Sequence, residues 1–256
     1  MTTAILSALP EEQNTLVARL AHPQRMTHAG RAFWRGELEG RAVVLALSGM
    51  GKVAAATTST ALIERFGAAR IVFTGVAGGV GDGVNVGDVV VAEDYLQHDM
   101  DASPLFPRWE VPGYARSRLR CDAALSAILL EAARDCVSSA ERRFDLQSVI
   151  PGPPAGRAPV SAHHGLVVSG DRFVCAADEA HRLRSALVDA GHAVLAVEME
   201  GAAVAQVCYD YGIPFAAVRT ISDRADDAAH VDFPRFVQAV ASRYAEQMVL
   251  AMMQKL

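Results

Sequence analysis

Carboxylic acids follow several of the apolar segments that the sequence predicts to be strands. Glu198 and Glu200 come directly after the apolar run 193–197, Asp223 ends the run 216–222, and Glu12 stands shortly after the first run. A carboxylate is costly to bury unless it is paired or binds something. In an α/β sheet, ligands bind beyond the carboxyl ends of the strands. These acids, together with Arg219, therefore indicate a binding or catalytic site at that edge.

Each acid also has a purely structural interpretation. Glu12 suits the first turn of a helix, and Glu198 and Glu200 suit a helix N-terminus before Gly201, because that end favours negative charge. Asp223 suits a helix N-cap. If the strand continued, extended geometry would place Glu198 and Glu200 on one face. We favour a site because independent structural causes would rarely place all of these residues at strand ends.

Two glycine-rich stretches also follow predicted strands. Glycine lets a ligand approach the backbone and leaves amide groups free to donate hydrogen bonds. The first stretch is Ser48-Gly49-Met50-Gly51-Lys52, and the second is Thr74-Gly75-Val76-Ala77-Gly78-Gly79. Neither matches a dinucleotide-binding or P-loop motif, and a tight turn explains either stretch taken alone. We expect the second stretch to be a loop.

Short apolar runs alternate with amphipathic stretches, which predicts an α/β fold with a parallel or mixed sheet. Residues 102–117 and 151–156 are rich in proline or glycine and are predicted to be loops. The predicted strands cover residues 4–8, 32–38, 41–47, 70–74, 86–92, 166–169, 194–197 and 215–221. The predicted helices begin near Pro10, cover 52–66 and 177–190, and begin again near Gly201 and Pro234.

The composition excludes several classes of protein. The chain has 256 residues, of which 51% are hydrophobic and 21% charged, with a net charge of −5. Intrinsic disorder needs lower hydrophobicity, and a membrane span needs a longer apolar run than any present. An acidic balance argues against nucleic acid as a partner. The apolar fraction slightly exceeds the usual half, which a sheet buried on both faces would absorb.

The cysteine pattern indicates the compartment. The four cysteines are irregularly spaced, without a CxxC pair or histidines at zinc-ligand spacing, so we expect free thiols and no metal. The N-terminus lacks the basic region of a secretory signal. A cytoplasmic location is therefore expected.

An ordered set of motifs then identifies a family. The chain resembles the nucleoside phosphorylase/hydrolase superfamily, and within it the 5′-methylthioadenosine/S-adenosylhomocysteine nucleosidases. The motifs cover nearly the whole chain. They are Ala8-x-x-Glu11-Glu12, Ser48-Gly49-x-Gly51-Lys52-Val53-Ala54-Ala55-Ala56, Thr74-Gly75-x-Ala77-Gly78-Gly79, Val86-Gly87-Asp88, His98-Asp99-x-Asp101, Val168-Ser169-Gly170-Asp171-x-Phe173, Val197-Glu198-Met199-Glu200 and Arg219-x-Ile221-Ser222-Asp223.

The resemblance implies one three-layer αβα domain over residues 1–256, with a central mixed, twisted sheet. It also implies hydrolysis of the N-glycosidic bond between adenine and a 5′-thio-substituted ribose, without a cofactor. The transition state of such a reaction resembles an oxocarbenium ion. By resemblance, Asp223 protonates adenine N7, Glu12 deprotonates the attacking water, and Glu200 accepts hydrogen bonds from the ribose hydroxyls.

The resemblance further implies a set of substrate-binding residues. Phe173 would stack on the purine and the Val174 backbone would read its edge, while Met199 would pack on the sugar. Glu198 and Arg219 would position the water and the carboxylates. The remaining members of the implied substrate site are Ala77, Gly78, Ser222, Met50 and Phe233, and core packing is an equal explanation for Met50.

The chain departs from the family pattern in three places. Val76 stands where these nucleosidases often carry a serine, so a hydroxyl contact near the water or the ribose would be missing. Residues 102–117 and the loop within 151–164 match compact relatives poorly, which leaves the substrate preference open. A homodimer is the usual state of relatives, and residues 102–117 are a candidate contact.

Three other functions stay open at this point. A phosphorylase of the same superfamily would need arginines around the glycine stretches to bind phosphate, whereas the chain offers Glu11 and Glu12 near its first strand. A hydrolase of futalosine-type nucleosides could use the same catalytic set. A non-catalytic nucleoside-binding protein would have no need of both an acid and a base.

Overall fold

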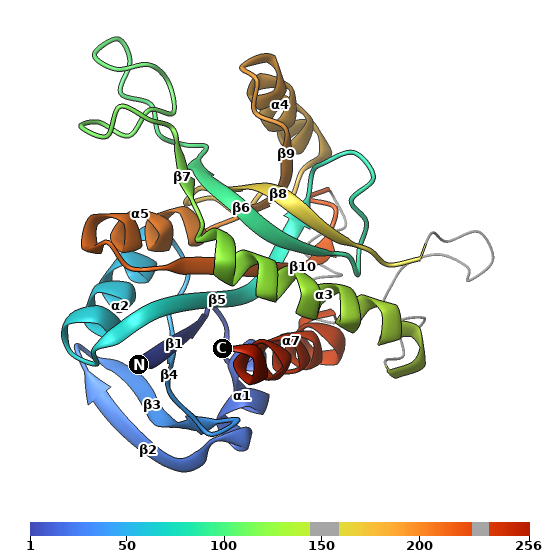
Figure 1. The fold of residues 1–256 in the computed structure, drawn as a ribbon. Coiled ribbons are helices and arrows are strands. Elements are labelled where there is room, and N and C mark those ends of the chain that lie inside the picture. The colour runs from blue at the N-terminus through green and yellow to red at the C-terminus, as the bar shows by residue number, and fades with distance from the viewer. Residues whose placement is uncertain (144–158, 227–235) are drawn as a thin grey trace.

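The chain folds around one mixed β-sheet. The structure is a computed structural model that describes residues 1–143, 159–226 and 236–256. The strands are β1 (Thr2–Ser7), β2 (Ala21–His28), β3 (Arg31–Leu38), β4 (Arg41–Leu47), β5 (Ala68–Gly79), β6 (Val89–Gln97), β7 (Arg118–Arg120), β8 (Ala162–Ser169), β9 (Val194–Glu198) and β10 (Phe215–Asp223). Neighbouring strands follow the order β10-β6-β8-β9-β5-β1-β4-β3-β2, and β7 pairs with β6 (Figure 1).

Helices cover both faces of this sheet. They are α1 (Pro10–Arg19), α2 (Lys52–Glu64), α3 (Ala123–Arg143), α4 (Ala177–Asp189), α5 (Gly201–Tyr211) and a π-helical turn (Val237–Ala241) that continues into α7 (Ser242–Lys255). Figure 1 shows α2 and α5 on one side of the central strands and α1, α3 and α7 on the other. The expected αβα arrangement around a mixed sheet is therefore confirmed.

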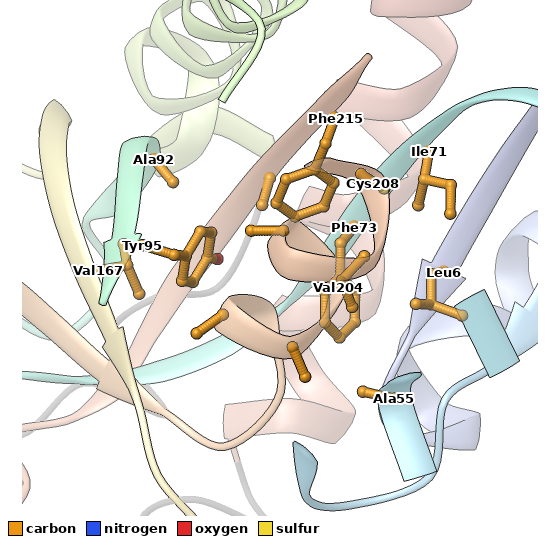
Figure 2. Packing of buried hydrophobic residues seen from close by; sticks show 14 of the residues in the cluster. Leu6, Ala55, Ile71, Phe73, Ala92, Tyr95, Val167, Val204, Cys208 and Phe215 are labelled. Atoms are coloured by element: carbon orange, nitrogen blue, oxygen red, sulfur yellow. The ribbon is translucent and has the colours of Figure 1, made fainter. Parts of the chain in front are cut away.

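Two large clusters of buried side chains hold these layers together. Phe73 of β5 belongs to the cluster under α2 and α5, with Ala55 and Val204 from those helices (Figure 2). The opposite cluster joins Leu16 of α1 and Met252 of α7 to the other face of the sheet. Every residue of β10 is buried. Strands covered on both faces in this way account for the apolar excess of the composition.

Five of the strands close on themselves, which an open sheet does not do. β5 pairs with β10 in parallel and, at its last two residues, with β9 in antiparallel fashion. β10 also pairs with β6, β6 with β8, and β8 with β9. Gly78 consequently pairs with both Val197 and Asp223. The closure brings the ends of β5, β9 and β10 to one place.

Several predicted elements differ from the observed ones. The second glycine stretch is not a loop, because β5 continues through it to Gly79 and is held there by strand partners on both sides. β2 and α3 were not predicted; β2 is exposed along nearly its whole length and, among the described strands, pairs with β3 alone. The strand predicted at 86–92 begins later and runs to Gln97. Pro234 and residues 151–158 lie outside the described residues.

The cysteines agree with the expectation from the sequence. All four cysteines are free thiols, and Cys136 and Cys208 are buried. Among the described residues, no helix is long and apolar enough to cross a membrane.

Candidate active site

A cavity, open on one side, lies where the carboxyl ends of β1, β5, β9 and β10 meet. It brings together nearly all of the residues that the sequence singled out: Glu12, Met50, Ala77, Gly78, Phe173, Val174, Glu198, Met199, Glu200, Arg219, Ser222 and Asp223. Phe233 lies outside the described residues.

Glu12 joins the start of α1 to the end of β5. Pro10 begins this helix, and Glu12 follows in its first turn. One carboxylate oxygen, Oε2, accepts hydrogen bonds from the amides of Ala8 and Leu9, both at 2.9 Å, and Oε1 accepts one from the Val76 amide at 3.1 Å. The first-turn interpretation is therefore correct, but the same carboxylate also lines the cavity.

The electrostatic surroundings of Glu12 suit a proton acceptor. The side chain is almost fully buried, and this burial raises its pKa to about 7, although the three amides and the Arg219 charge act in the opposite direction. A carboxylate with a pKa near neutrality can take a proton in the physiological range and release it again.

Glycines let these charged groups approach the backbone of β5. A Cβ atom on Gly75 would lie 3.2 Å from Arg219 Nη1 and 3.3 Å from Glu12 Oε1. A Cβ on Gly78 would lie 3.1 Å from Asp223 Oδ1 and only 2.9 Å from the side chain of Ala225. The glycines therefore serve close approach within an extended strand, rather than a turn.

Glu198 and Arg219 form a buried ion pair beside the cavity. Arg219 Nη2 donates to Glu198 Oε2 at 2.7 Å, and both side chains are nearly inaccessible to solvent. The Glu198 carboxylate also accepts hydrogen bonds from the Ser169 hydroxyl and from the amides of Glu200 and Gly201. The Arg219 guanidinium lies 3.9 Å from the centre of the Phe73 ring. So many partners indicate that Glu198 holds Arg219 and the β9–α5 junction in place.

Glu200 is fixed differently from Glu198. β9 ends at Glu198, so the extended-strand argument for placing both acids on one face was wrong, although both line the cavity. Glu200 is the N-cap residue of α5, and its Oε1 accepts a hydrogen bond from the Gly51 amide at 2.8 Å. Burial and then the neighbouring Glu198 charge raise the pKa of Glu200.

Asp223 ends β10 and is 3% exposed. Its N-cap interpretation was wrong, because no helix begins here among the described residues. The Ser222 hydroxyl donates to Asp223 Oδ2 at 2.8 Å, and the Ala225 amide donates to Oδ1 at 2.8 Å. These two donors fix the plane of the carboxyl group at the wall of the cavity.

The other end of the cavity is open. Val174 is buried, but Phe173 is 44% exposed and Met50 is 69% exposed, which excludes core packing for Met50. Both exposed side chains line the cavity with Met199. Val76 contributes its amide to Glu12, and its partly buried side chain packs against the second core cluster.

The structure adds residues that motif positions alone did not single out as ligands. Ser169, at the end of β8, donates to Glu198 and accepts from the Ala202 amide. The Gly51 amide donates to Glu200, and the amides of Ala8 and Leu9 donate to Glu12. Ser169 and Gly51 belong to the family motifs, so the sequence did point to them. A hydrogen bond from a backbone amide does not depend on the type of side chain, so the sequence gives no sign of it.

The charges around the cavity do not favour an anion. Among the described lining residues, the cations are Arg219, paired with Glu198, and Arg172, whose side chain is 76% exposed and paired with Glu179. Four carboxylic acids line the same cavity. The described residues contain no cluster of His, Cys, Asp and Glu that could hold a metal ion.

Comparison with known proteins places the chain in a family. The model of the phosphorylase superfamily matches residues 2–254. The 5′-methylthioadenosine/S-adenosylhomocysteine nucleosidase of Shewanella denitrificans is 32% identical, with all of both chains covered. The chain is a member of this nucleosidase family.

Solved structures agree with this assignment. The nucleosidase of the same description from Neisseria meningitidis, in complex with methylthio-immucillin-A, has a TM-score of 0.85 and 32% identity, with 100% of this chain and 99% of that chain covered. A futalosine hydrolase mutant of Helicobacter pylori has a TM-score of 0.82 and 27% identity, with both chains fully covered. The structures similar to this chain therefore include both a methylthioadenosine/S-adenosylhomocysteine nucleosidase and a futalosine hydrolase.

Proposed function

We propose that this nucleosidase family member hydrolyses the N-glycosidic bond of methylthioadenosine and S-adenosylhomocysteine, releasing adenine and the thioribose. The observation that carries the proposal is that Glu12, Glu200 and Asp223 line one cavity. Hydrolysis of this bond needs an acid for the leaving base and a base for the water. A binding protein would need neither.

Asp223 is the general acid of this mechanism. Its proton passes to adenine N7 while the electron pair of the C1′–N9 bond moves into the purine, so that adenine leaves as a neutral base. Ser222 and the Ala225 amide hold the carboxyl group in one orientation, which supports transfer along a fixed direction.

Glu12 is the general base. As the ribose gains oxocarbenium character, the water oxygen bonds to C1′ and a water proton passes to Glu12. The three amides that hold Glu12 stabilise its ionised form, and burial opposes it, which together leave a base of moderate strength.

The remaining residues bind the two halves of the substrate. Glu200 accepts hydrogen bonds from the ribose hydroxyls, and Met199 packs on the sugar. Phe173 stacks on the purine, whose edge is read by the backbone of Val174. Met50 contacts the 5′-thio substituent at the open end. Their common position on one cavity supports these roles.

Water, rather than phosphate, is the nucleophile in this proposal. A phosphate site is typically built from arginine or lysine side chains free to make bidentate or charge-assisted hydrogen bonds. The Arg219 charge is already paired with Glu198, and the lining acids would repel an anion. These observations disfavour the phosphorylase alternative.

An adenine-release assay tests the function. Purified protein is incubated with methylthioadenosine, S-adenosylhomocysteine and a deoxyfutalosine analogue, each with and without phosphate. We expect adenine from the first two substrates, at rates that do not depend on phosphate. Strict phosphate dependence would indicate a phosphorylase, and adenine release from none of them, with measurable binding, would indicate a non-catalytic protein.

One observation favours a second candidate function, the hydrolysis of futalosine-type nucleosides. The structural likeness to the Helicobacter pylori futalosine hydrolase mutant is close to the likeness to the Neisseria meningitidis nucleosidase. The same acid and base would serve both substrates, since the bond broken is of the same kind. A higher kcat/KM for the deoxyfutalosine analogue than for methylthioadenosine would support this alternative.

We also infer a homodimer that uses residues 102–117 and the neighbouring face of α2 and α5. The Tyr114 ring contacts the Tyr209 ring of α5, with their centres 5.5 Å apart, and the Tyr114 hydroxyl donates to Asp210, so this segment lies against the helix. The same two parts of the chain carry Leu105 and Val53, large apolar side chains that are 83% and 79% exposed. Equilibrium sedimentation of the wild type and of Leu105→Glu and Val53→Glu tests this. We expect a dimer that the substitutions weaken.

The four free thiols support a location in the reducing cytoplasm.

A further inference from the structure

Two backbone segments carry the exposed side chains that line the open end of the cavity. One is the turn from Gly49 to Lys52 before α2, which carries Met50. The other is the loop after β8, which carries Phe173 and Val174. These segments are more than a hundred residues apart in sequence, and no strand pairing joins them. A group of charged side chains outside the cavity joins the two segments instead.

The first link is a carboxylate of one segment that caps the helix beginning in the other. Asp171 Oδ1 accepts a hydrogen bond from the Lys52 amide at 2.8 Å, in the first turn of α2. Negative charge is favoured at this end of a helix. The preceding residue, Gly51, has a φ of 91°, and a Cβ there would lie 3.1 Å from Asp171 Oδ1. The link therefore depends on glycine at that position.

The second link runs through Asp99, just after β6. The Lys52 ammonium donates to Asp99 Oδ1 at 2.6 Å, and the Asp171 amide donates to Asp99 Oδ2 at 2.9 Å. The ammonium also donates to Gln97 Oε1 at 3.0 Å. Asp99 is thus bound at the same time by Lys52 at the start of α2 and by the loop after β8.

Lys52 is the most shielded member of this group. Its side chain is 15% exposed, against 32% for Asp99 and 50% for Asp171. Burial acts to raise the pKa of Asp99, but the Lys52 ammonium and the Asp171 amide outweigh it and hold the pKa below its usual range. Charge-assisted hydrogen bonds of this kind are stronger than neutral ones.

We propose that Lys52, Asp99 and Asp171 form a clasp that holds these two segments of the cavity wall in a fixed position relative to each other. The inference rests on the proposed function and concerns residues that do not touch the reacting atoms. On one side the clasp fixes the turn whose Gly51 amide binds Glu200, and on the other it fixes the loop that carries Phe173. Because the two segments are already ordered in the free protein, substrate binding does not have to supply the free energy of ordering them.

The first measurement is hydrogen exchange of the protein without ligand. In the wild type we expect the amides of Lys52 and Asp171 to be protected. In Lys52→Met the Lys52 amide remains available to Asp171, so the substitution removes only the ammonium. We expect peptides covering 49–54 and 169–175 to exchange at least tenfold faster in Lys52→Met and in Asp99→Asn.

The second measurement is steady-state kinetics with methylthioadenosine. We expect Lys52→Met and Asp171→Ala to raise KM about tenfold while kcat stays within twofold, and Asp171→Asn, which keeps an acceptor oxygen, to recover most of the loss. The matched control is Lys255→Met, which removes the ion pair of Lys255 with Glu131 far from the cavity. This control should leave KM unchanged.

The outcomes separate the clasp from the proposed function. Unchanged exchange of both peptides in Lys52→Met would overturn the clasp, as would equal kinetic effects of Lys52→Met and Lys255→Met. If the wild type releases no adenine, the proposed function fails, whereas the exchange measurement still tests whether the clasp holds the two segments.

Discussion

The two ends of the cavity are built in different ways. At the closed end, Glu12, Arg219 and Asp223 are each at most 3% exposed and are held by amides, a hydroxyl or an ion pair. At the open end, Met50 and Phe173 remain largely exposed. The closed end is formed by strand ends and the open end by loops, and loops are the segments that vary most readily.

This difference separates the chemistry from recognition. Proton transfer requires groups fixed to within a fraction of an ångström, and the closure of five strands supplies that rigidity. Recognition of the 5′ substituent takes place where the chain leaves apolar side chains uncovered. Substitutions at the closed end should therefore lower kcat or stability, and substitutions at the open end should change KM.

The largest effect is expected for the general acid. Asp223→Asn should lower kcat about a thousandfold, because general acid catalysis typically contributes 10²- to 10⁴-fold. KM for methylthioadenosine should stay within about threefold, in keeping with an isosteric change. Steady-state kinetics and calorimetric binding measure both quantities. Asp189→Asn, at the exposed end of α4, is the control. A wild-type kcat in Asp223→Asn would show that Asp223 is not the general acid.

The pH dependence tests Glu12. A base must be ionised to accept a proton, and burial raises the pKa of Glu12 to about 7. We expect kcat/KM to fall about tenfold per unit as the pH drops below 7, because Glu12 then becomes protonated. Glu12→Gln should lose at least a hundredfold in kcat and should lack this limb. If kcat/KM of Glu12→Gln fell over the same pH range, the fall would have to be assigned to another titrating group.

The buried ion pair should have its main effect on stability. Arg219→Met leaves Glu198 buried without its cation, and breaking such a pair typically costs about 3–5 kcal/mol of unfolding free energy. Urea denaturation measures the change. Arg184→Met, which removes the exposed pair with Asp82, is the control and should cost less than about 1 kcal/mol. Equal losses in the two variants would show that burial does not distinguish the pairs.

The smallest effect belongs to the open end. Phe173→Ala should raise KM about tenfold, consistent with about 1–3 kcal/mol for stacking of a base on an aromatic ring and with the partial exposure of this one. kcat should change less than threefold, and Phe173→Tyr should restore KM. A fall in kcat without a change in KM would contradict the division between the two ends.

Much of the site could be predicted from the sequence because its side chains stand at strand ends. Apolar runs of strand length located those ends, and carboxylates directly after them were conspicuous. β5 was predicted too short because Gly75, Gly78 and Gly79 weaken a strand locally, and only pairing with β9 and β10 extends it.

Other features could not be predicted in this way. β2 has no alternation of apolar and polar residues, since it is exposed along most of its length. The link between Asp171 and Lys52 joins residues 119 positions apart and has no periodicity. α3 is different, because Leu125, Leu129 and Ala133 recur on one buried face, so its pattern was present in the sequence.

The double attachment of Glu12 has an evolutionary consequence. Its carboxylate satisfies two amides at the start of α1 and one amide of β5, so it supports the fold as well as the reaction. A descendant that no longer needed to cleave nucleosides would still lose stability by replacing it. Selection for a folded protein thus protects the catalytic base. Glu12 is therefore replaced more slowly than it would be if it served catalysis alone.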